Sequence, residues 1–494
     1  MASKFRILAS QTIATLAISL LKFTTGSTMG FTTIFIGELA KENAEISVTL
    51  DELTWYSSYF FLVPFGSLVG GFITQRLGSR SIFIISAIIY IVSWLMYHWS
   101  TTSEMILCAQ VLIGLVNGLL TAPSLTFIAE ITQPRLRSTF MSTAILFYLS
   151  GQFFTILLGG YVYWRTIALV NLTFPVIALI MCSCIPNSPH WLASKNRIDD
   201  AQKSLAWYRG WVNPNTIKSE IETMESKWNT TLDSSTNVSN NGNAHNYNTI
   251  MRLKNTLKPY LNRTFYIPLA TSCYIFFINT FGGSHTVQVF SAVLFEKMKS
   301  PFETQTATII LNAFRTIGAI SCLFTIRLVG KRKLLFFSVI GGGTCFAFAA
   351  VFNYLINSNY IVSSEYIWIP TISVLLAIFV IAAGIDKITH LLNIEIFPSS
   401  NRLVGSGLGE TFYNLILSAL NKTFLYLTKY ITLSGIFAIF SITNIIGFIT
   451  LYFIIHETEG KTLNEIEEHY TGRRRLEKKQ NNVEDKRIPN DINA

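Results

Sequence analysis

Charged residues are scarce in this 494-residue chain, where Asp, Glu, Lys and Arg together make up 13%. An ordinary soluble domain carries about 25%. Half of the residues are hydrophobic, and the mean hydropathy is +0.42. So little charge excludes a disordered chain, and it also excludes a nucleic-acid-binding protein despite a net charge of +10. The composition indicates a protein that crosses a membrane many times.

Several chemical signatures are missing as well. The six cysteines all lie in apolar stretches and form no C-x-x-C pairs, so neither a disulfide framework nor a zinc site is indicated. The sequence contains no phosphate-binding loop of the Gly-x-x-x-x-Gly-Lys-Ser/Thr type and no nucleophile motif. We therefore expect neither an enzyme nor an ATP-driven pump, and no cofactor or metal.

Long apolar runs are present instead. A bilayer core about 30 Å thick needs roughly 20 mainly apolar residues per helix, and the runs predict an all-α membrane protein with twelve spans. The predicted spans are 10–34, 54–74, 81–99, 105–129, 139–162, 165–185, 265–294, 304–327, 334–356, 366–394, 404–428 and 432–455. Lys22 lies within the first run, and we expect its ammonium group to extend toward an interface.

Basic residues collect on one side of this topology, which the positive-inside rule makes cytoplasmic. The residues on that side include Lys4, Arg6, Arg76, Arg80, Arg135, Arg137, Arg327, Lys331, Arg332, Lys333 and Arg402, together with the C-terminal tail. Both termini are then cytoplasmic. The positive charge sets topology and is no footprint of nucleic acid, and lipids are the expected surroundings.

The spans divide the chain into four parts. We predict an N-terminal six-helix bundle at 1–185, a cytoplasmic linker at 186–264, a C-terminal six-helix bundle at 265–456 and a cytoplasmic tail at 457–494. An amphipathic segment near 197–228 lies in the linker.

The two halves repeat a charge motif. Glu130 precedes Arg137 after the fourth span, and Glu395 precedes Arg402 at the same spacing after the tenth, with a proline between them each time. A second echo joins the loop that holds Arg76 and Arg80 to the loop that holds Lys331 and Arg332. Such repeats are typical of transporters built from two pseudo-symmetric halves.

This repeat has two interpretations. Carboxylates at helix ends can pair with guanidinium groups of the other half when the cytoplasmic side is closed, which makes them a gate. Alternatively, the charges only set topology and anchor helix ends. We favour the gate, because topology does not require the two glutamates. The predicted gating residues are Glu130, Arg137, Glu395, Arg402, Arg76, Arg80, Lys331 and Arg332.

Three motifs carry a family resemblance. His456-Glu-Thr-Glu-Gly-Lys-Thr-Leu follows the last span, Pro186-Asn-Ser-Pro-His-Trp-Leu192 follows the sixth, and Gly26-Ser-Thr-Met-Gly30 lies in the first. From about residue 15 to 470 the chain resembles sugar porters of the major facilitator superfamily, and among them the insect facilitated trehalose transporter-like branch. The resemblance implies two six-helix bundles that alternate access to a central sugar site, in the plasma membrane.

The departures from the family pattern concern the cytoplasmic ion pairs. Gln75 and Ser79 replace an acid and an arginine, Gln110 replaces an arginine, and Asn187 and His190 replace a glutamate and an arginine. Arg327 stands where the family has an acid. The resemblance therefore implies that the cytoplasmic ion pairs of the gate, called the latch below, are weaker or differently arranged than in the family.

In the family, amide side chains and an aromatic ring bind the sugar, and amides suit a neutral polyol because they both donate and accept. On this pattern Asn279, Thr280 and His285 replace amides of the seventh span, and Asn414 keeps an amide of the eleventh. With His390 of the tenth span, these are the predicted substrate-binding residues. Ile145 and Leu415 stand where the family carries a glutamine and a tryptophan.

The tenth span is unusual because it contains Asp386 and Lys387. Charges inside a membrane need partners. Adjacent residues do not share a helix face, so Arg315 of the eighth span is the expected partner of Asp386. The alternatives are a purely structural network and a pocket for an anionic or larger polar substrate.

Proton coupling is not favoured. His285 and His390 could carry protons, but a lone histidine on a helix is more often structural. Proton-linked sugar porters carry an acid in the first span, where Thr28 stands here, which implies a uniporter. The leading hypothesis is facilitative transport of trehalose or a hexose. A non-transporting nutrient sensor and a carrier of another small polar or anionic solute are the alternatives, and the oligomeric state stays open.

Overall fold

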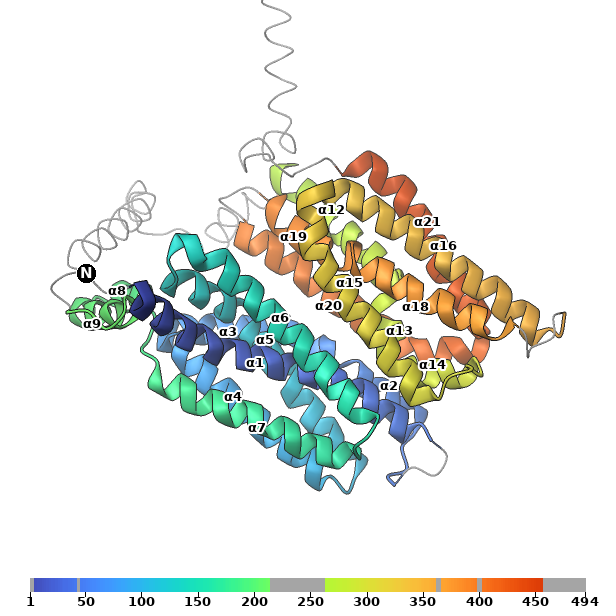
Figure 1. The fold of residues 1–494 in the computed structure, drawn as a ribbon, viewed down its shortest axis with the longest axis horizontal. Helices are drawn as coiled ribbons and strands as arrows, with labels where there is room; N and C mark the ends of the chain where they lie inside the picture. The colour runs from blue at the N-terminus through green and yellow to red at the C-terminus, as the bar shows by residue number, and fades with distance from the viewer. Residues whose placement is uncertain (1–3, 42–44, 214–262, 361–365, 398–401, 456–494) are drawn as a thin grey trace, which may run out of the picture.

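The computed structural model describes residues 4–41, 45–213, 263–360, 366–397 and 402–455. Within these ranges the chain is helical, and no strand occurs in them (Figure 1). The helices are α1 (Lys4–Leu39), α2 (Leu50–Ser57), η1 (Tyr59–Leu62), α3 (Val63–Leu77), α4 (Ser79–Trp99), α5 (Ser103–Ile131), α6 (Pro134–Gly159), α7 (Trp164–Cys184), α8 (Pro189–Ser194), α9 (Ile198–Tyr208), α12 (Arg263–Phe281), α13 (Ser284–Val289), α14 (Ser291–Lys297), α15 (Thr304–Val329), α16 (Lys331–Asn357), α18 (Trp368–Ala382), α19 (Ile385–Glu395), α20 (Arg402–Tyr430) and α21 (Leu433–Ile454).

Eleven helical segments of the described chain are long and apolar enough to cross a membrane, and each falls on a predicted span. The one remaining predicted span, 404–428, the eleventh in order, is α20. It is more polar than the others because it carries Glu410, Lys422 and several amide and hydroxyl side chains. The fold is therefore the predicted all-α arrangement of twelve helices in two bundles.

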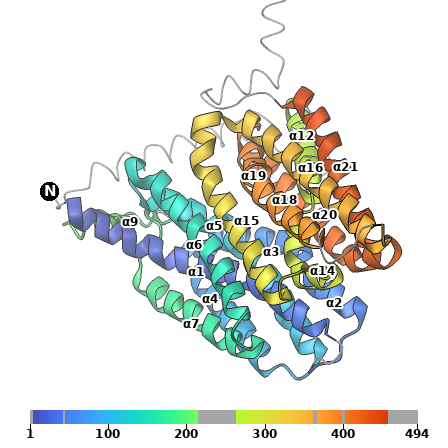
Figure 2. The same ribbon diagram turned by 45° about the vertical axis from the view of Figure 1, so that its right-hand side comes forward.

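The internal repeat is visible in the packing. In the N-terminal half α1 packs on α6, α3 on α5 and α4 on α7. In the C-terminal half the corresponding pairs are α12 with α20, α15 with α18, and α16 with α21. The two bundles lie side by side, blue to green and yellow to red in Figures 1 and 2. The charge motifs thus repeat because the helices that carry them occupy equivalent places.

Two spans of the C-terminal half are interrupted. α12 ends at Phe281 and α13 begins at Ser284; Gly283 between them has φ +87°, in the left-handed region where a side chain is strained. α18 ends at Ala382 and α19 begins at Ile385, whose backbone N–H donates to the Ser338 hydroxyl at 2.8 Å. Both breaks leave helix ends inside the bundle, where polar side chains can meet.

The linker begins with two short helices, α8 and α9, whose apolar faces form a small cluster of their own. The Tyr208 carbonyl at the end of α9 accepts hydrogen bonds from Ser10 and Gln11 of α1, so the linker lies against the start of α1. We call this end of the protein the N-terminal face and the opposite end the far face. The amphipathic segment predicted at 197–228 is helical over Ile198–Tyr208; its part beyond residue 213, the tail 457–494 and the motif that starts at His456 lie outside the described residues.

Candidate functional site

A cluster of charged side chains lies between the two helix breaks. Asp386, in the first turn of α19, is fully buried. It lies 3.2 Å from Arg315 of α15 and 2.8 Å from Nε2 of His285 in α13. The expected pairing of Arg315 with Asp386 is confirmed. A buried carboxylate tolerates this position because it faces cations and sits at the positive end of a helix.

Lys387 also pairs with Asp386, with 3.2 Å between its Nζ atom and the carboxylate. The expectation that adjacent residues would not meet is therefore wrong. Both residues lie in the first turn of α19, and the flexible four-carbon stem of lysine lets the ammonium group fold back onto its neighbour. One carboxylate thus faces two permanent cations and an imidazole.

The cluster connects the two halves of the protein. Nη1 of Arg315 donates to the Gln152 side-chain oxygen at 3.1 Å, and Gln152 belongs to α6 of the N-terminal bundle. Gln152 was not among the predicted site residues, because a single amide in an apolar helix has no local signature. Its Nε2 atom and Nε of Arg315 are buried and have no hydrogen-bond partner among the described residues.

The predicted residue Asn279 is buried near the end of α12, six positions before His285 in the sequence. Neither polar atom of its side chain has a partner among the described residues, and the same is true of both amide atoms of Gln288 on α13 and of the Ser284 hydroxyl. Thr280 differs, because its hydroxyl donates to the Phe276 carbonyl one turn earlier. Unpaired buried amides are costly, so they mark a place suited to a hydroxyl-bearing ligand or water.

The two predicted histidines are joined by an aromatic residue. The Tyr413 ring on α20 lies 6.0 Å from the His285 ring and 5.2 Å from the His390 ring, centroid to centroid. His390 has its own partner, Glu410, at 2.8 Å from Nδ1. His285 therefore belongs to the charged cluster, whereas His390 belongs to a separate pair nearer the start of α20.

Asn414 faces a second feature, a cavity of about 250 Å³ formed by both halves. Its walls include Lys22 and Thr25 of α1, Asn117 of α5, Ile145 and Tyr148 of α6, and Asn414 of α20. The Asn414 amide nitrogen donates to the Glu410 carbonyl at 2.7 Å, which leaves its oxygen for the cavity.

The cavity corrects the expectation for Lys22. Its ammonium group does not extend to an interface, because Lys22 sits at the middle of α1 and donates to the Leu120 carbonyl of α5 at 3.4 Å. Lys22 lies midway along the predicted span 10–34 as well as along the helix. At 1.5 Å per residue, each end of the span is about 18 Å away, which is farther than a lysine side chain reaches.

At the N-terminal face, several of the predicted gating residues have contacts near their own helix ends. Glu130 accepts from the Ser188 hydroxyl, and Glu395 pairs with Lys331 at 2.7 Å. Arg80 donates to the carbonyls of Cys182 and Ser183, Arg332 donates to the Tyr452 carbonyl, Arg76 lies over the Phe72 ring, and Arg137 is exposed. The Arg402 side chain lies outside the described part. The cross-half latch stays a prediction.

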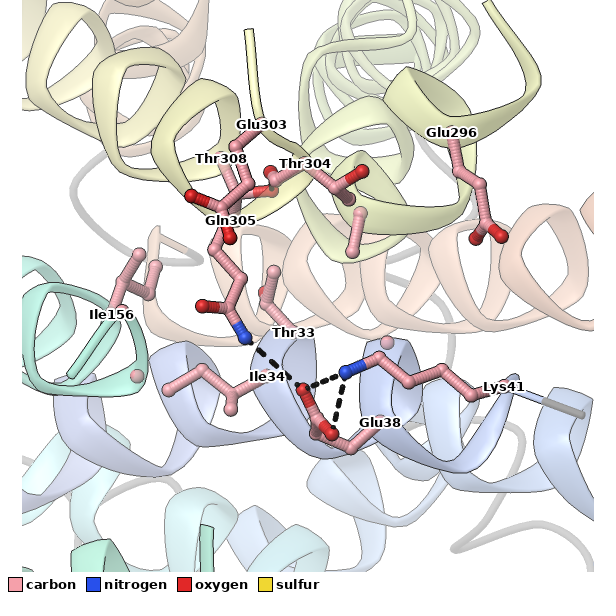
Figure 3. A pocket seen from close by; sticks show the side chains of 14 residues that line it. Thr33, Ile34, Glu38, Lys41, Ile156, Glu296, Glu303, Thr304, Gln305 and Thr308 are labelled. Carbon is pink, nitrogen blue, oxygen red and sulfur yellow. Dashed lines mark hydrogen bonds and ion pairs between the residues drawn. The ribbon is translucent and has the colours of Figure 1, made fainter. Parts of the chain in front are cut away.

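The far face joins the halves. Lys422 of α20 pairs with Asp51 of α2, the Tyr426 hydroxyl donates to the same carboxylate at 3.1 Å, and Asn421 donates to the Ser57 carbonyl. On α1, Glu38 binds Lys41 and accepts from Gln305 of α15 at 3.3 Å, beside a cavity of about 270 Å³ (Figure 3). The described halves therefore meet at the far face and at the charged cluster.

The far-face pair yields a pH prediction. The hydrogen bond from Lys422 holds the pKa of the Asp51 carboxyl below its usual value. The charged pair should therefore be complete above the ordinary Asp range near 3.9 and disappear only as pH falls through the lowered pKa. The reporter is a Ser418→Cys thiol, which replaces a buried hydroxyl that donates to the Ser58 carbonyl. At neutral pH, loss of the ion pair in Asp51→Asn should speed labelling of this thiol by about twofold to fivefold.

The control is Asp199→Asn, the same change on an exposed residue of α9, which should leave the labelling rate unchanged. Labelling is measured with a maleimide that does not cross membranes. Equal rates in Asp51→Asn and in the control would show that the pair does not hold the far face together.

Comparison with known proteins gives the family. The profile described as "Sugar (and other) transporter" matches residues 11–470, almost the whole chain. The chain belongs to this sugar transporter family. It is a multi-pass membrane protein and not an enzyme.

Individual relatives of this transporter are sugar transporters too. The facilitated trehalose transporter Tret1 of Bombyx mori is 24% identical over 469 residues, which cover 94% of this chain and 88% of that protein. Tret1 of Apis mellifera ligustica is 25% identical over 468 residues with the same coverage. Among solved structures, the inward-open xylose transporter XylE from E. coli superposes with a TM-score of 0.70 at 16% identity, over 93% of this chain and 99% of that one. This last likeness shows the fold alone.

Proposed function

We propose that this transporter carries a sugar, trehalose or a hexose, down its gradient by alternating access of its two bundles. The N-terminal face is then cytoplasmic and the membrane is the plasma membrane. Uniport is favoured because the first span presents Thr28, whose hydroxyl donates to the Thr25 carbonyl, where proton-linked sugar porters carry an acid.

The observation that carries the proposal is the set of unpaired polar atoms in the middle of the bundle. Asn279 and Gln288 present buried amides with no described partner on either side of the α12–α13 break. Amides can donate to and accept from the hydroxyl groups of a neutral sugar without burying a new charge. Asn414 presents an acceptor to the separate cavity that Lys22 lines. Thr280 and His285, next to these amides on α12 and α13, and His390 complete the proposed substrate-binding residues.

The contacts between the halves also support alternating access. The far face is joined through Asp51 of α2 and Lys422 of α20, one from each half. This arrangement fits a conformation open to the cytoplasm. In the opposite state, the latch would pair the glutamates Glu130 and Glu395 with arginines of the other half, and the far-face contacts would break.

The test is uptake of radiolabelled trehalose and glucose by oocytes that express the chain, at two external pH values, with surface expression measured in the same cells. We expect saturable uptake that does not change with pH, and Asn279→Leu should reduce it at least about tenfold because a bound hydroxyl loses its partners. The matched control is Asn357→Leu, the same change on an exposed residue at the end of α16, which should transport normally.

Absence of uptake of both sugars, with the protein at the surface, would overturn sugar transport and leave a nutrient sensor or a carrier of another solute. The second of these has an observation in its favour, the cavity that contains Lys22.

A further inference from the structure

Lys22 is unusual because it faces a cavity without an acidic partner. It is the only charged side chain among the described residues that line the cavity. Its one described contact is the Leu120 carbonyl at 3.4 Å, and no carboxylate of the described chain lies within ion-pair distance of it. An ammonium group inside a membrane protein is costly unless it is paired, so a negative charge in the cavity would stabilise it.

The neighbouring polar groups present further donors. The Asn117 side-chain oxygen accepts from Tyr90, and Tyr90 in turn contacts Thr25. This chain fixes the orientation of the Asn117 amide, with its oxygen engaged and its NH2 group free to donate. Lys22 needs only one of its three N–H groups for Leu120. One wall of the cavity therefore presents an ammonium group and an amide donor, an arrangement that suits a carboxylate or phosphate.

The C-terminal half contributes an acceptor to the cavity, Asn414 of α20. Because the Asn414 nitrogen donates to the Glu410 carbonyl, its oxygen is left to accept from a hydroxyl group. Ile145 and Phe60 add apolar surface. At about 250 Å³, the cavity lies just below the range of drug-sized ligand sites, roughly 300–1,000 Å³. Its size and lining fit one sugar ring better than two.

We infer that this cavity binds a monosaccharide-sized polyol that carries one anionic group, a carboxylate or a phosphate, with the Lys22 ammonium group and the Asn117 amide on the anion and Asn414 on a hydroxyl. The inference goes beyond the proposed function, because it assigns an anionic solute to a second site, which neither Asn279 nor Gln288 lines. It follows from Lys22 and not from Arg315 or Lys387, since both of these already face Asp386.

The test is equilibrium binding of radiolabelled D-glucuronate to the purified full-length protein, with competition by unlabelled solutes. D-glucuronamide has the same shape without the charge. We expect D-glucuronate to bind the unaltered protein at least about tenfold more tightly than D-glucuronamide. Stronger competition by D-glucose 6-phosphate than by D-glucuronate would assign the anion to a phosphate, and the reverse order to a carboxylate.

Variants locate the charge. Lys22→Met should weaken D-glucuronate binding at least about tenfold, whereas Lys22→Arg, which keeps the cation, should stay within about threefold. Lys333→Met is the matched control, because Lys333 is exposed at the start of α16, and it should bind like the unaltered protein. A folded Lys22→Met protein with full affinity, or equal binding of the acid and the amide by the unaltered protein, would overturn the inference. The amide comparison decides even if Lys22→Met does not fold.

Failure of this inference differs from failure of the proposed function. Uptake of neutral sugar by a protein that ignores D-glucuronate would retain the transporter and discard the anion site. Binding of D-glucuronate that depends on Lys22, without uptake of any of these solutes, would retain the site and discard transport.

Discussion

Replacement of Asp386 by asparagine should destabilise the protein by about 3–5 kcal/mol, the usual cost of removing one partner of a buried ion pair. The side chain is fully buried and faces Arg315, His285 and Lys387. Without the carboxylate, two cations remain close together inside the membrane. We expect a marked fall in the midpoint of thermal unfolding in detergent and loss of transport.

Two further variants test the pairing itself. Asp199→Asn makes the same chemical change on the exposed face of α9 and should leave the midpoint unchanged. Asp386→Asn combined with Arg315→Gln removes both charges of the pair, so the double variant should be less destabilised than the sum of the two single variants by about 0.5–3 kcal/mol. A purely additive result would count against the pair.

Replacement of Gly26 by valine should prevent α1 and α6 from packing. A Cβ atom at Gly26 would lie 1.9 Å from the Tyr148 carbonyl oxygen and 3.0 Å from the Gln152 backbone nitrogen. These are backbone atoms, so no side-chain rotation can relieve the clash, and the helices must separate. Overpacking of a core usually costs about 1–3 kcal/mol and at times more. We expect little monodisperse protein on size-exclusion chromatography and an intermediate yield for Gly26→Ala.

Gly71 provides the control, because a Cβ atom there would meet nothing within 4 Å. Gly71→Ala in α3 should be neutral or slightly stabilising, since alanine favours a helix more than glycine does. If Gly26→Ala and Gly71→Ala gave equal yields, the close approach of α1 and α6 would not matter to the fold. The contact also holds Tyr148 and Gln152 in place, so any surviving Gly26→Ala protein should transport poorly.

The geometry of the site explains why some of its contacts could be predicted from the sequence and others could not. Arg315 could be matched to Asp386 because both are charges in apolar helices, where each needs an opposite charge. His390 was predicted to face the substrate without its partner Glu410, because nothing in the sequence indicates which way α19 turns toward α20. The far-face pair of Asp51 and Lys422 joins residues that are 371 positions apart, and no local pattern links them.

The sequence by itself determined the membrane class, the twelve spans, the repeat of two halves and the family, because apolar length, loop charge and short terminal motifs are local properties of the chain. Only the tertiary structure decided where the polar side chains point. Lys22 faces a cavity, Gln152 reaches Arg315 across the halves, and Lys387 folds back onto Asp386. These contacts depend on where helices cross and break, and crossing is set by close packing between segments that are distant in the chain.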